Sequence, residues 1–164
     1  MKPRAQELIR LLQLQPHPEG GWFAEVFRSD ASVQPKDDRG LRSALTCIYF
    51  LLEAHQFSQW HRVRSDEVWV HLEGDALKLW CWDGHSASAT FATLGPVETQ
   101  GAQRPQHTIA AGHWQAARPA AQGVLSSKGY TLVACMVAPG FDFVDFCLLG
   151  KEMPEFVFLN QICL

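Results

Sequence analysis

The stretch from Phe57 to Gly74 reads FSQWHRVRSDEVWVHLEG, and it decides how the rest of the chain is interpreted. Side chains of an extended strand point alternately to opposite faces. His61 and Glu67 then lie on two successive predicted strands, and we expect them to converge if the turn at residues 64–66 pairs these strands. An imidazole and a carboxylate that meet in this way bind a divalent metal or form a general base and its orienting group.

Length and composition bound the class of protein. The chain has 164 residues, 47% of them hydrophobic, and a formal net charge of -3. These values are typical of one globular domain with a real core. We expect no nucleic-acid partner, because such binding requires a basic patch. We expect no membrane partner either, because no apolar run approaches the roughly 20 residues that span a bilayer.

The cysteines favour a reducing compartment. They are odd in number, lie in or beside apolar runs, and form no CxxC pair. This pattern fits buried, reduced thiols better than a disulfide framework. The N-terminus also lacks the apolar core and cleavage site of a signal peptide. We therefore predict a cytoplasmic protein whose free thiols are Cys47, Cys81, Cys135, Cys147 and Cys163.

Hydrophobic periodicity predicts a short helix followed by many short strands. Apolar residues recur at helical spacing over residues 5–14, and prolines end the helix. Turn signals every few residues then indicate an all-β sandwich or barrel. The charged run at residues 36–39 is expected to be solvated. We predict one domain, with an N-terminal helix (1–15), a jelly roll (22–149) and a C-terminal arm (150–164). The expected strands are 22–28, 44–52, 57–63, 67–72, 76–82, 87–94, 107–111, 114–117, 130–137 and 143–149.

The central stretch resembles the first metal-binding motif of the cupin superfamily, His-x-His-x(3–4)-Glu-x6-Gly. His61, Glu67 and Gly74 occupy the motif positions, and Val63 replaces the second histidine. The second cupin motif begins Pro-x-Gly-x2-His. Gly112 matches its glycine, and Gln115 stands where its histidine belongs.

Five further segments make the resemblance more specific. PHPEGGWFAEVFRS, TCIYFLL, FSQWHRVRSDEVW, GHWQAA and VAPGFDFVDF, in this order, are similar to the cupin group called cupin family five. The resemblance covers residues 14–149 and implies a double-stranded β-helix, a homodimer, and a pocket lined by polar and aromatic residues. The group also resembles in fold the metal-independent nucleotide-sugar epimerases, whose histidine base corresponds to His61.

Several residues are candidates for this pocket. Gln115 offers a weak oxygen ligand, and His71 is the reserve ligand, so a metal site would comprise His61, Glu67, Gln115 and His71. Arg28 and Arg42 flank a polar loop and are expected to pair with an anionic ligand or with surface carboxylates. His17 is expected to brace its loop. The expected ligand-binding residues are Gln115, Trp69, Arg28, Tyr49, Trp60 and Phe141.

Three functions remain open on these residues. The first is a metal-independent isomerase or epimerase of a carbohydrate-like anionic ligand, with His61 as the proton acceptor and Glu67 orienting it. The second is a metal-dependent enzyme with one divalent ion at the atypical site. The third is a non-catalytic sensor, which the fold equally permits. His61 and Glu67 can also be read as a buried hydrogen-bonded pair.

Overall fold

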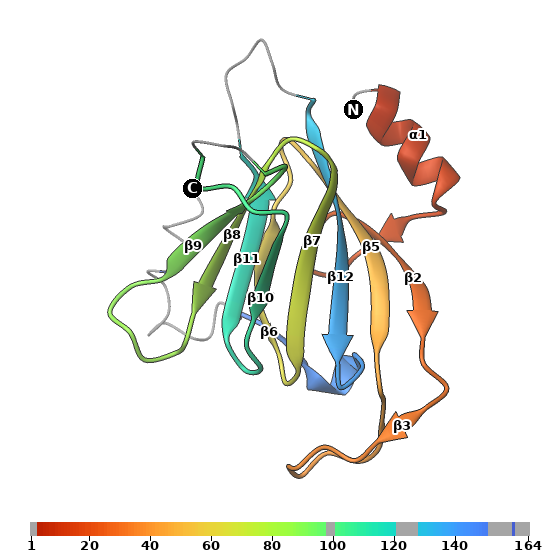
Figure 1. Cartoon of the computed structure of the whole chain (residues 1–164), viewed down its shortest axis with the longest axis vertical. Coiled ribbons are helices and arrows are strands. Elements are labelled where there is room, and N and C mark those ends of the chain that lie inside the picture. Colours follow the sequence, from red (N-terminus) through yellow and green to blue (C-terminus); the bar gives the residue numbers. More distant parts are fainter. Residues whose placement is uncertain (1–2, 98–100, 121–127, 151–158, 160–164) are drawn as a thin grey trace.

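A computed structural model describes residues 3–97, 101–120 and 128–150 together with Leu159. Two antiparallel sheets, of six and five strands, dominate the architecture. Figure 1 shows β2, β5, β12 and β7 side by side, with the helix α1 near one end of this sheet. The predicted arm at 150–164 lies outside the described residues, except for its first residue and Leu159.

The larger sheet has the strand order β1-β2-β5-β12-β7-β10. Neighbouring strands are antiparallel, and β5 and β12 form the long central pair. The apolar run expected at residues 44–52 becomes β5, which is buried along much of its length. The strands are β1 (Gln15–Pro16), β2 (Trp22–Arg28), β5 (Thr46–Glu53), β7 (Asp66–Gly74), β10 (Gln106–Ile109) and β12 (Tyr130–Ala138).

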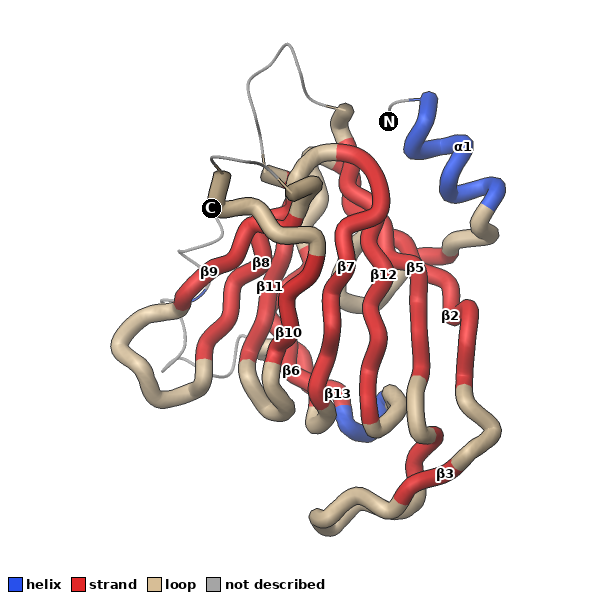
Figure 2. The backbone as a smooth tube through the Cα atoms, in the orientation of Figure 1, coloured by secondary structure: helices blue, strands red, loops and turns tan. Residues whose placement is uncertain are grey.

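The smaller sheet has the order β13-β6-β11-β8-β9. A two-stranded hairpin, β3 (Ser32–Val33) and β4 (Arg42–Ser43), extends beyond the end of the large sheet (Figure 2). The segment expected as a strand at 143–149 begins instead as a 3-10 turn, η1 (Phe143–Asp145), because Asp142 caps it by accepting from the Val144 N–H. The strands are β6 (Ser58–Val63), β8 (Leu77–Trp82), β9 (Thr90–Leu94), β11 (Trp114–Pro119) and β13 (Phe146–Leu148).

Alternation along the strands places one apolar cluster between the sheets and a further cluster on the outer face of each sheet. Leu79 of β8 and Phe50 of β5 belong to the core between the sheets, so the two sheets face each other. Trp80 and Trp82 point the other way and pack on the outer face of the small sheet. The result is the predicted jelly roll, in which each strand contributes one side chain in two to the interior.

The helix α1 (Pro3–Leu11) ends earlier than the predicted 5–14. Gln13 takes a left-handed φ of 54°, and the Leu14 N–H donates to the Ile9 carbonyl at 2.9 Å. This is a Schellman arrangement, which terminates a helix. None of the helices in the described ranges has the length and apolar character needed to cross a bilayer.

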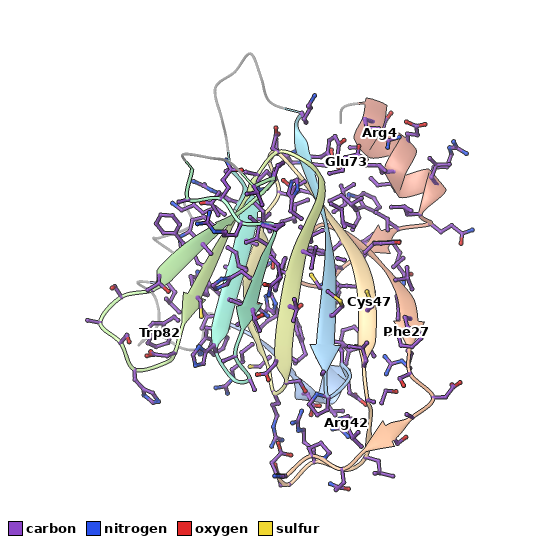
Figure 3. All side chains as sticks on the ribbon, in the orientation of Figure 1. Arg4, Phe27, Arg42, Cys47, Glu73 and Trp82 are labelled. Atoms are coloured by element: carbon purple, nitrogen blue, oxygen red, sulfur yellow. The ribbon has the colours of Figure 1, made fainter. Side chains whose placement is uncertain are left out.

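Two contacts attach α1 to the large sheet. Ala5 and Leu8 are buried in an apolar cluster with Leu51 of β5. Arg4 donates from Nε and Nη2 to the Glu73 carboxylate at 2.8 and 2.9 Å. Figure 3 shows Arg4 and Glu73 facing each other at this end of the sheet. The helix therefore closes one end of the sheet through an apolar cluster and an ion pair.

The charged run at residues 36–39 is only partly solvated. Arg39 is buried, which contradicts the expectation for this residue. Its guanidinium donates to Ser65 Oγ at 2.9 Å and to the buried Asp145 carboxylate at 3.3 Å. Arg42 binds the same carboxylate at 2.8 Å. Arg39 and Arg42 thus share one buried carboxylate, Asp145, that lies more than 100 residues further along the chain.

Candidate functional site

A cavity of about 40 Å³ lies between the two sheets. Both sheets and the loop between β1 and β2 contribute to its walls. Most of its lining is apolar or aromatic, with a small number of titratable groups, which is the usual composition of a ligand site. The lining residues are His17, Glu19, Phe23, Thr46, Ile48, Phe50, His61, Val63, Glu67, Cys135, Val137, Phe141 and Phe146.

His61 and Glu67 both line this cavity, but they do not come from a hairpin. The expected pairing of their strands through residues 64–66 is wrong: β6 pairs with β11 and β13, and β7 pairs with β10 and β12. The end of β6 is already occupied, because the Val63 carbonyl accepts from the Gly112 N–H at 2.8 Å. The connection therefore crosses between sheets, and the two side chains approach from different sheets.

His61 is held in one neutral tautomer. Its Nδ1 lies 2.7 Å from the Gln59 carbonyl oxygen, which can only accept, so Nδ1 carries the hydrogen. The side chain is 2% exposed, and burial lowers the pKa of His61, although the nearby Glu67 opposes this shift. The unprotonated Nε2 then faces Glu19, whose Oε2 lies 3.2 Å away. His61 is thus a fixed proton acceptor at Nε2.

Glu19 reaches the cavity because of the two glycines that follow it. Gly20 and Gly21 have positive φ values of 108° and 72°. A Cβ on Gly20 would lie 2.5 Å from the Phe57 carbonyl oxygen, and one on Gly21 would lie 2.7 Å from the Leu51 carbonyl oxygen. Only glycine permits this approach of the loop to β5 and to the segment before β6. The loop backbone is then fixed where the Gln59 N–H donates to the Glu19 carbonyl at 2.8 Å.

The Glu19 carboxyl group is buried without a cationic side chain beside it. Ser58 Oγ donates to Oε1 at 2.9 Å, and Oε2 faces His61. Burial raises the pKa of Glu19 to about 8, and the Ser58 hydrogen bond opposes this rise only in part. At neutral pH Glu19 therefore carries a proton, which it donates toward His61 Nε2.

His17 is the second histidine of the cavity. Its Nδ1 accepts from the Glu19 N–H at 3.3 Å, so it braces its loop as expected and also lines the cavity. Its ring packs edge-on against Phe23, with 4.5 Å between centroids. Burial lowers the pKa of His17 to about 4, with a further contribution from His61. His17 is therefore neutral at physiological pH.

Glu67 is oriented by a chain of side-chain hydrogen bonds. Gln115 Nε2 donates to Glu67 Oε2 at 2.6 Å, and Trp69 Nε1 donates to Gln115 Oε1 at 3.0 Å. Trp69 thus determines which end of the amide faces Glu67. Burial raises the pKa of Glu67 to about 7, and His61 acts in the opposite direction. This places a carboxyl group that titrates near neutrality on the wall contributed by β7.

The remaining aromatic candidates divide between the cavity and other cores. Phe141 lines the cavity, so its predicted role in ligand binding stays a prediction. Trp60 lies on the outer face of the small sheet, where its Nε1 donates to the Leu159 carbonyl at 2.8 Å. Tyr49 packs against the apolar cluster beneath α1. Trp60 and Tyr49 are therefore not brought to the cavity.

The charged candidates also lie elsewhere. Arg28 pairs with Glu25 at 2.6 Å on the exposed part of β2. Arg42 pairs with Asp145, and Figure 3 places it near the hairpin end of the molecule. His71 Nε2 lies 3.1 Å from the Asp75 carbonyl oxygen and is not part of the cavity lining. The structure thus brings no expected anion-binding arginine to the site.

Sequence reasoning did not identify Glu19. No strand alternation marks it, because it lies in a loop about 40 residues before His61 in the chain. The segment PHPEGG nevertheless carries a usable signal. Two consecutive glycines after a charged residue indicate a close backbone approach, which can place that residue inside the fold.

The expected metal ligands do not fit a metal ion as they are arranged here. Gln115 Oε1 accepts from Trp69, and its amide nitrogen, which is not a ligand, faces Glu67. Val63 supplies only an alkyl group. Within residues 3–97, 101–120 and 128–150 and Leu159, no three His, Cys, Asp or Glu side chains form a group that could hold a metal ion. We therefore derive no chemistry from a metal at this site.

The comparisons with known proteins agree with this fold. A hypothetical protein from Leishmania major is 33% identical, with a TM-score of 0.83 over 96% of this chain and 93% of that one. A Shewanella oneidensis protein is 30% identical, with a TM-score of 0.79 over 96% of this chain and 91% of that one. A variant of Bacillus subtilis oxalate decarboxylase is 11% identical, with a TM-score of 0.56 over 91% of this chain and 34% of that one, which shows similarity of fold alone.

No curated protein matches the sequence. The profile of the family described as "Cupin superfamily (DUF985)" matches residues 6–149, which is most of the chain and includes every cavity residue named above. This protein is therefore a member of that cupin family.

Proposed function

We propose that this protein binds a small molecule in the cavity and moves a proton on it, as an isomerase or epimerase does. The observation that supports the proposal is the meeting of two buried carboxyl groups and a tautomer-locked histidine in one cavity. Glu67 and Glu19 have pKa values raised by burial to about 7 and about 8. Groups that titrate near the working pH are efficient general acids and bases.

The two acids differ in the role that each can take. Glu67, with the lower pKa, is the base that removes a proton from a carbon next to a carbonyl group of the ligand. The bonding electrons move to the carbonyl oxygen, forming an enolate. The pair of Glu19 and His61, which holds one proton at 3.2 Å separation, donates to this oxygen or returns a proton to carbon. Glu67 then holds one extra proton and the Glu19–His61 pair lacks one, so Glu67 releases its proton to water and the pair takes one up from water before the next turnover.

These roles differ from the arrangement of the resembling epimerases. The resemblance implies a tyrosine as their acid, but the two tyrosines of this chain, Tyr49 and Tyr130, are not among the residues that line the cavity. We propose that the carboxyl group of Glu19 takes the place of that phenol. Glu19, rather than Glu67, faces Nε2 of His61, and the Gln59 carbonyl orients the ring.

The homodimer and the cytoplasmic location stay predictions. Sedimentation of the purified protein tests whether it is a dimer.

Exchange of solvent deuterium into the ligand tests the proton transfer. The protein is incubated in deuterated buffer with small hydroxycarbonyl compounds, and NMR follows the C–H signal next to the carbonyl. We expect Glu67→Gln to slow exchange by about 100-fold or more, because a general base contributes at least this factor. The rate should follow a bell-shaped pH profile between the apparent pKa values of the coupled acids.

A matched control separates chemistry from general charge effects. Glu25→Gln removes a carboxylate from β2 that pairs with Arg28 outside the cavity, and it should leave exchange unchanged. A Glu67→Gln protein that exchanges deuterium at the wild-type rate would contradict the assignment of the base. A panel in which no compound exchanges would contradict the isomerase proposal.

A further inference from the structure

Any charge that the described lining of the cavity carries near neutral pH is negative: Glu67 ionises first and Glu19 at higher pH, while His17 and His61 are neutral. Glu19 and Glu67 are the acids among its described lining residues, and that lining contains no lysine or arginine. The arginines near the cavity are paired with carboxylates. Arg42 binds Asp145, and Arg64 binds Asp38. Arg28, whose Nη1 donates to the Phe141 carbonyl at 3.2 Å, binds Glu25. An anion entering the cavity would therefore meet two carboxyl groups and no counter-charge.

Aromatic rings form much of the remaining wall. Phe146 lies 5.5 Å from His61 and 6.0 Å from Phe141, measured between ring centroids. Phe50 and Phe23 line the opposite side, around His17. The faces of such rings carry partial negative charge and attract cations, most strongly where water is excluded. Carboxyl groups and aromatic faces thus favour the same kind of ligand charge.

The size of the cavity limits the group that it encloses. The space open to the centres of water-sized atoms is small, about 40 Å³. The enclosed part of a ligand therefore has few heavy atoms. A sugar ring would also need many hydrogen-bonding partners, whereas most of the lining side chains are hydrocarbon.

We propose that the group bound in this cavity is a small organic cation, a substituted ammonium, seated between Glu67 and Glu19 against the phenylalanine rings. This names the ligand class for the site described above and rests on the proposed function in taking that cavity as the ligand site. The cation supplies the positive charge that the protein does not place there, and its methyl or methylene groups contact the aromatic walls. It replaces the anionic ligand expected from the sequence.

Binding of a cation is linked to proton release. The groups around Glu67 are Glu19 from the β1–β2 loop, His61 from β6, Gln115 from β11 and Cys135 from β12, and none of them is a fixed cation. Because the pKa of Glu67 lies at about 7, a cation binds best to the ionised form present above this pH. Its affinity should rise as pH increases, whereas an anion would show the opposite trend.

Three probes of similar globular shape and different charge test the proposal. Tetramethylammonium is the cation, tert-butanol is neutral, and pivalate is the anion. We expect tetramethylammonium to bind at least about tenfold more tightly than tert-butanol in NMR titrations of the full-length protein. Its affinity should increase about tenfold between about pH 6 and about pH 8.5. Pivalate should bind most weakly.

Variants identify the charged group responsible. Glu67→Gln should remove most of the pH-dependent increase for tetramethylammonium, and Glu25→Gln should retain it. If Glu67→Gln does not melt cooperatively, the wild-type pH series with the three probes still tests the proposal, because a cation should gain affinity as pH rises and an anion should lose it. Tightest binding of pivalate, equal binding of the three probes, or no binding of tetramethylammonium would each overturn the proposal.

The outcomes separate this inference from the proposed function. Cation binding without deuterium exchange in any substituted-ammonium carbonyl compound would support the ligand class and contradict the proton transfer. Exchange in neutral or anionic compounds, with no cation binding, would support the proton transfer and contradict the cationic ligand class.

Discussion

Carboxyl groups in two regions of this molecule experience opposite environments. In the cavity, Glu19 and Glu67 are buried beside neutral partners, and burial raises their pKa values. At the hairpin end, Asp145 has a similarly low exposed fraction, 4% against 5% for Glu19, but Arg42 and Arg39 hold its pKa below the ordinary value. A low exposed fraction alone therefore does not determine the charge of an acid. The presence of a hydrogen-bonded cation does, so the first region is suited to proton transfer and the second to holding the fold.

The largest expected effect comes from breaking the second region. Asp145→Asn removes the buried carboxylate that Arg39 and Arg42 share, with side chains 5% and 12% exposed, and Arg39 keeps its second partner, Asp37. Removing one partner of a buried ion pair costs about 4 kcal/mol, which we expect as a loss in the free energy of unfolding. Urea denaturation followed by tryptophan fluorescence measures this loss.

An exposed ion pair on the same loop provides the control for this variant. Asp38, which binds Arg64, has a side chain that is 81% exposed. Asp38→Asn should leave the denaturation midpoint unchanged within error, because exposed pairs contribute little. Equal losses in the free energy of unfolding for the two variants would contradict a larger contribution from the buried carboxylate of Asp145.

The next prediction concerns the stability that Glu19 contributes, which should decrease as pH rises. The raised pKa of Glu19 means that the folded state binds this proton more tightly than the unfolded state does. Stability is therefore fully present below the ordinary glutamate pKa and is lost as pH rises toward about 8. Glu19→Gln imitates the protonated acid, and it should stabilise the protein at about pH 8.5 by on the order of 2 kcal/mol.

Thermal or urea unfolding of both proteins at a series of pH values checks this prediction. Near pH 5 the wild-type protein and Glu19→Gln should have nearly the same stability, because Glu19 is then protonated. A Glu19→Gln variant that is less stable than the wild type at high pH would show that the folded state favours the ionised carboxylate. That result would contradict a raised pKa of Glu19.

The smallest expected effect concerns Glu73. Hydrogen bonds from Arg4 and Tyr130 lower the pKa of Glu73 to about 2, but its side chain is 37% exposed. Water screens this pair, so Glu73→Gln should cost no more than about 1 kcal/mol at neutral pH. The contribution is present above the ordinary glutamate pKa and is lost as pH falls toward about 2. Acid titration of unfolding by circular dichroism should therefore bring the variant and the wild type together at low pH.

The sequence was sufficient for the barrel and for part of the site. Alternation and turn residues predicted most strands to within a few positions, because burial of one face imposes a period of two. The spacing of His61, Glu67 and Gln115 located residues that the fold brings close together. These residues lie on strands, where the direction of a side chain follows from its position in the pattern.

Other features depend on contacts that no local pattern encodes. The pairing of β6 with β11 and β13, rather than with β7, follows from the whole topology. Arg39 is buried beside Asp145, a partner that lies 106 residues further along the chain and that no local pattern identifies. Glu19 enters the cavity through a loop whose path is determined by its close approach to Phe57. Each of these outcomes is a long-range consequence of folding.

The Gly20–Gly21 approach has one further implication, for how such a scaffold could be re-engineered. A single short segment delivers both His17 and Glu19, while the barrel strands deliver His61 and Glu67. Exchanging the PHPEGG segment for another of equal length would therefore replace the proposed acid, Glu19, without redesign of the sheets. Any transplanted segment would have to preserve the two glycines, because a Cβ at either position would collide with a backbone carbonyl oxygen.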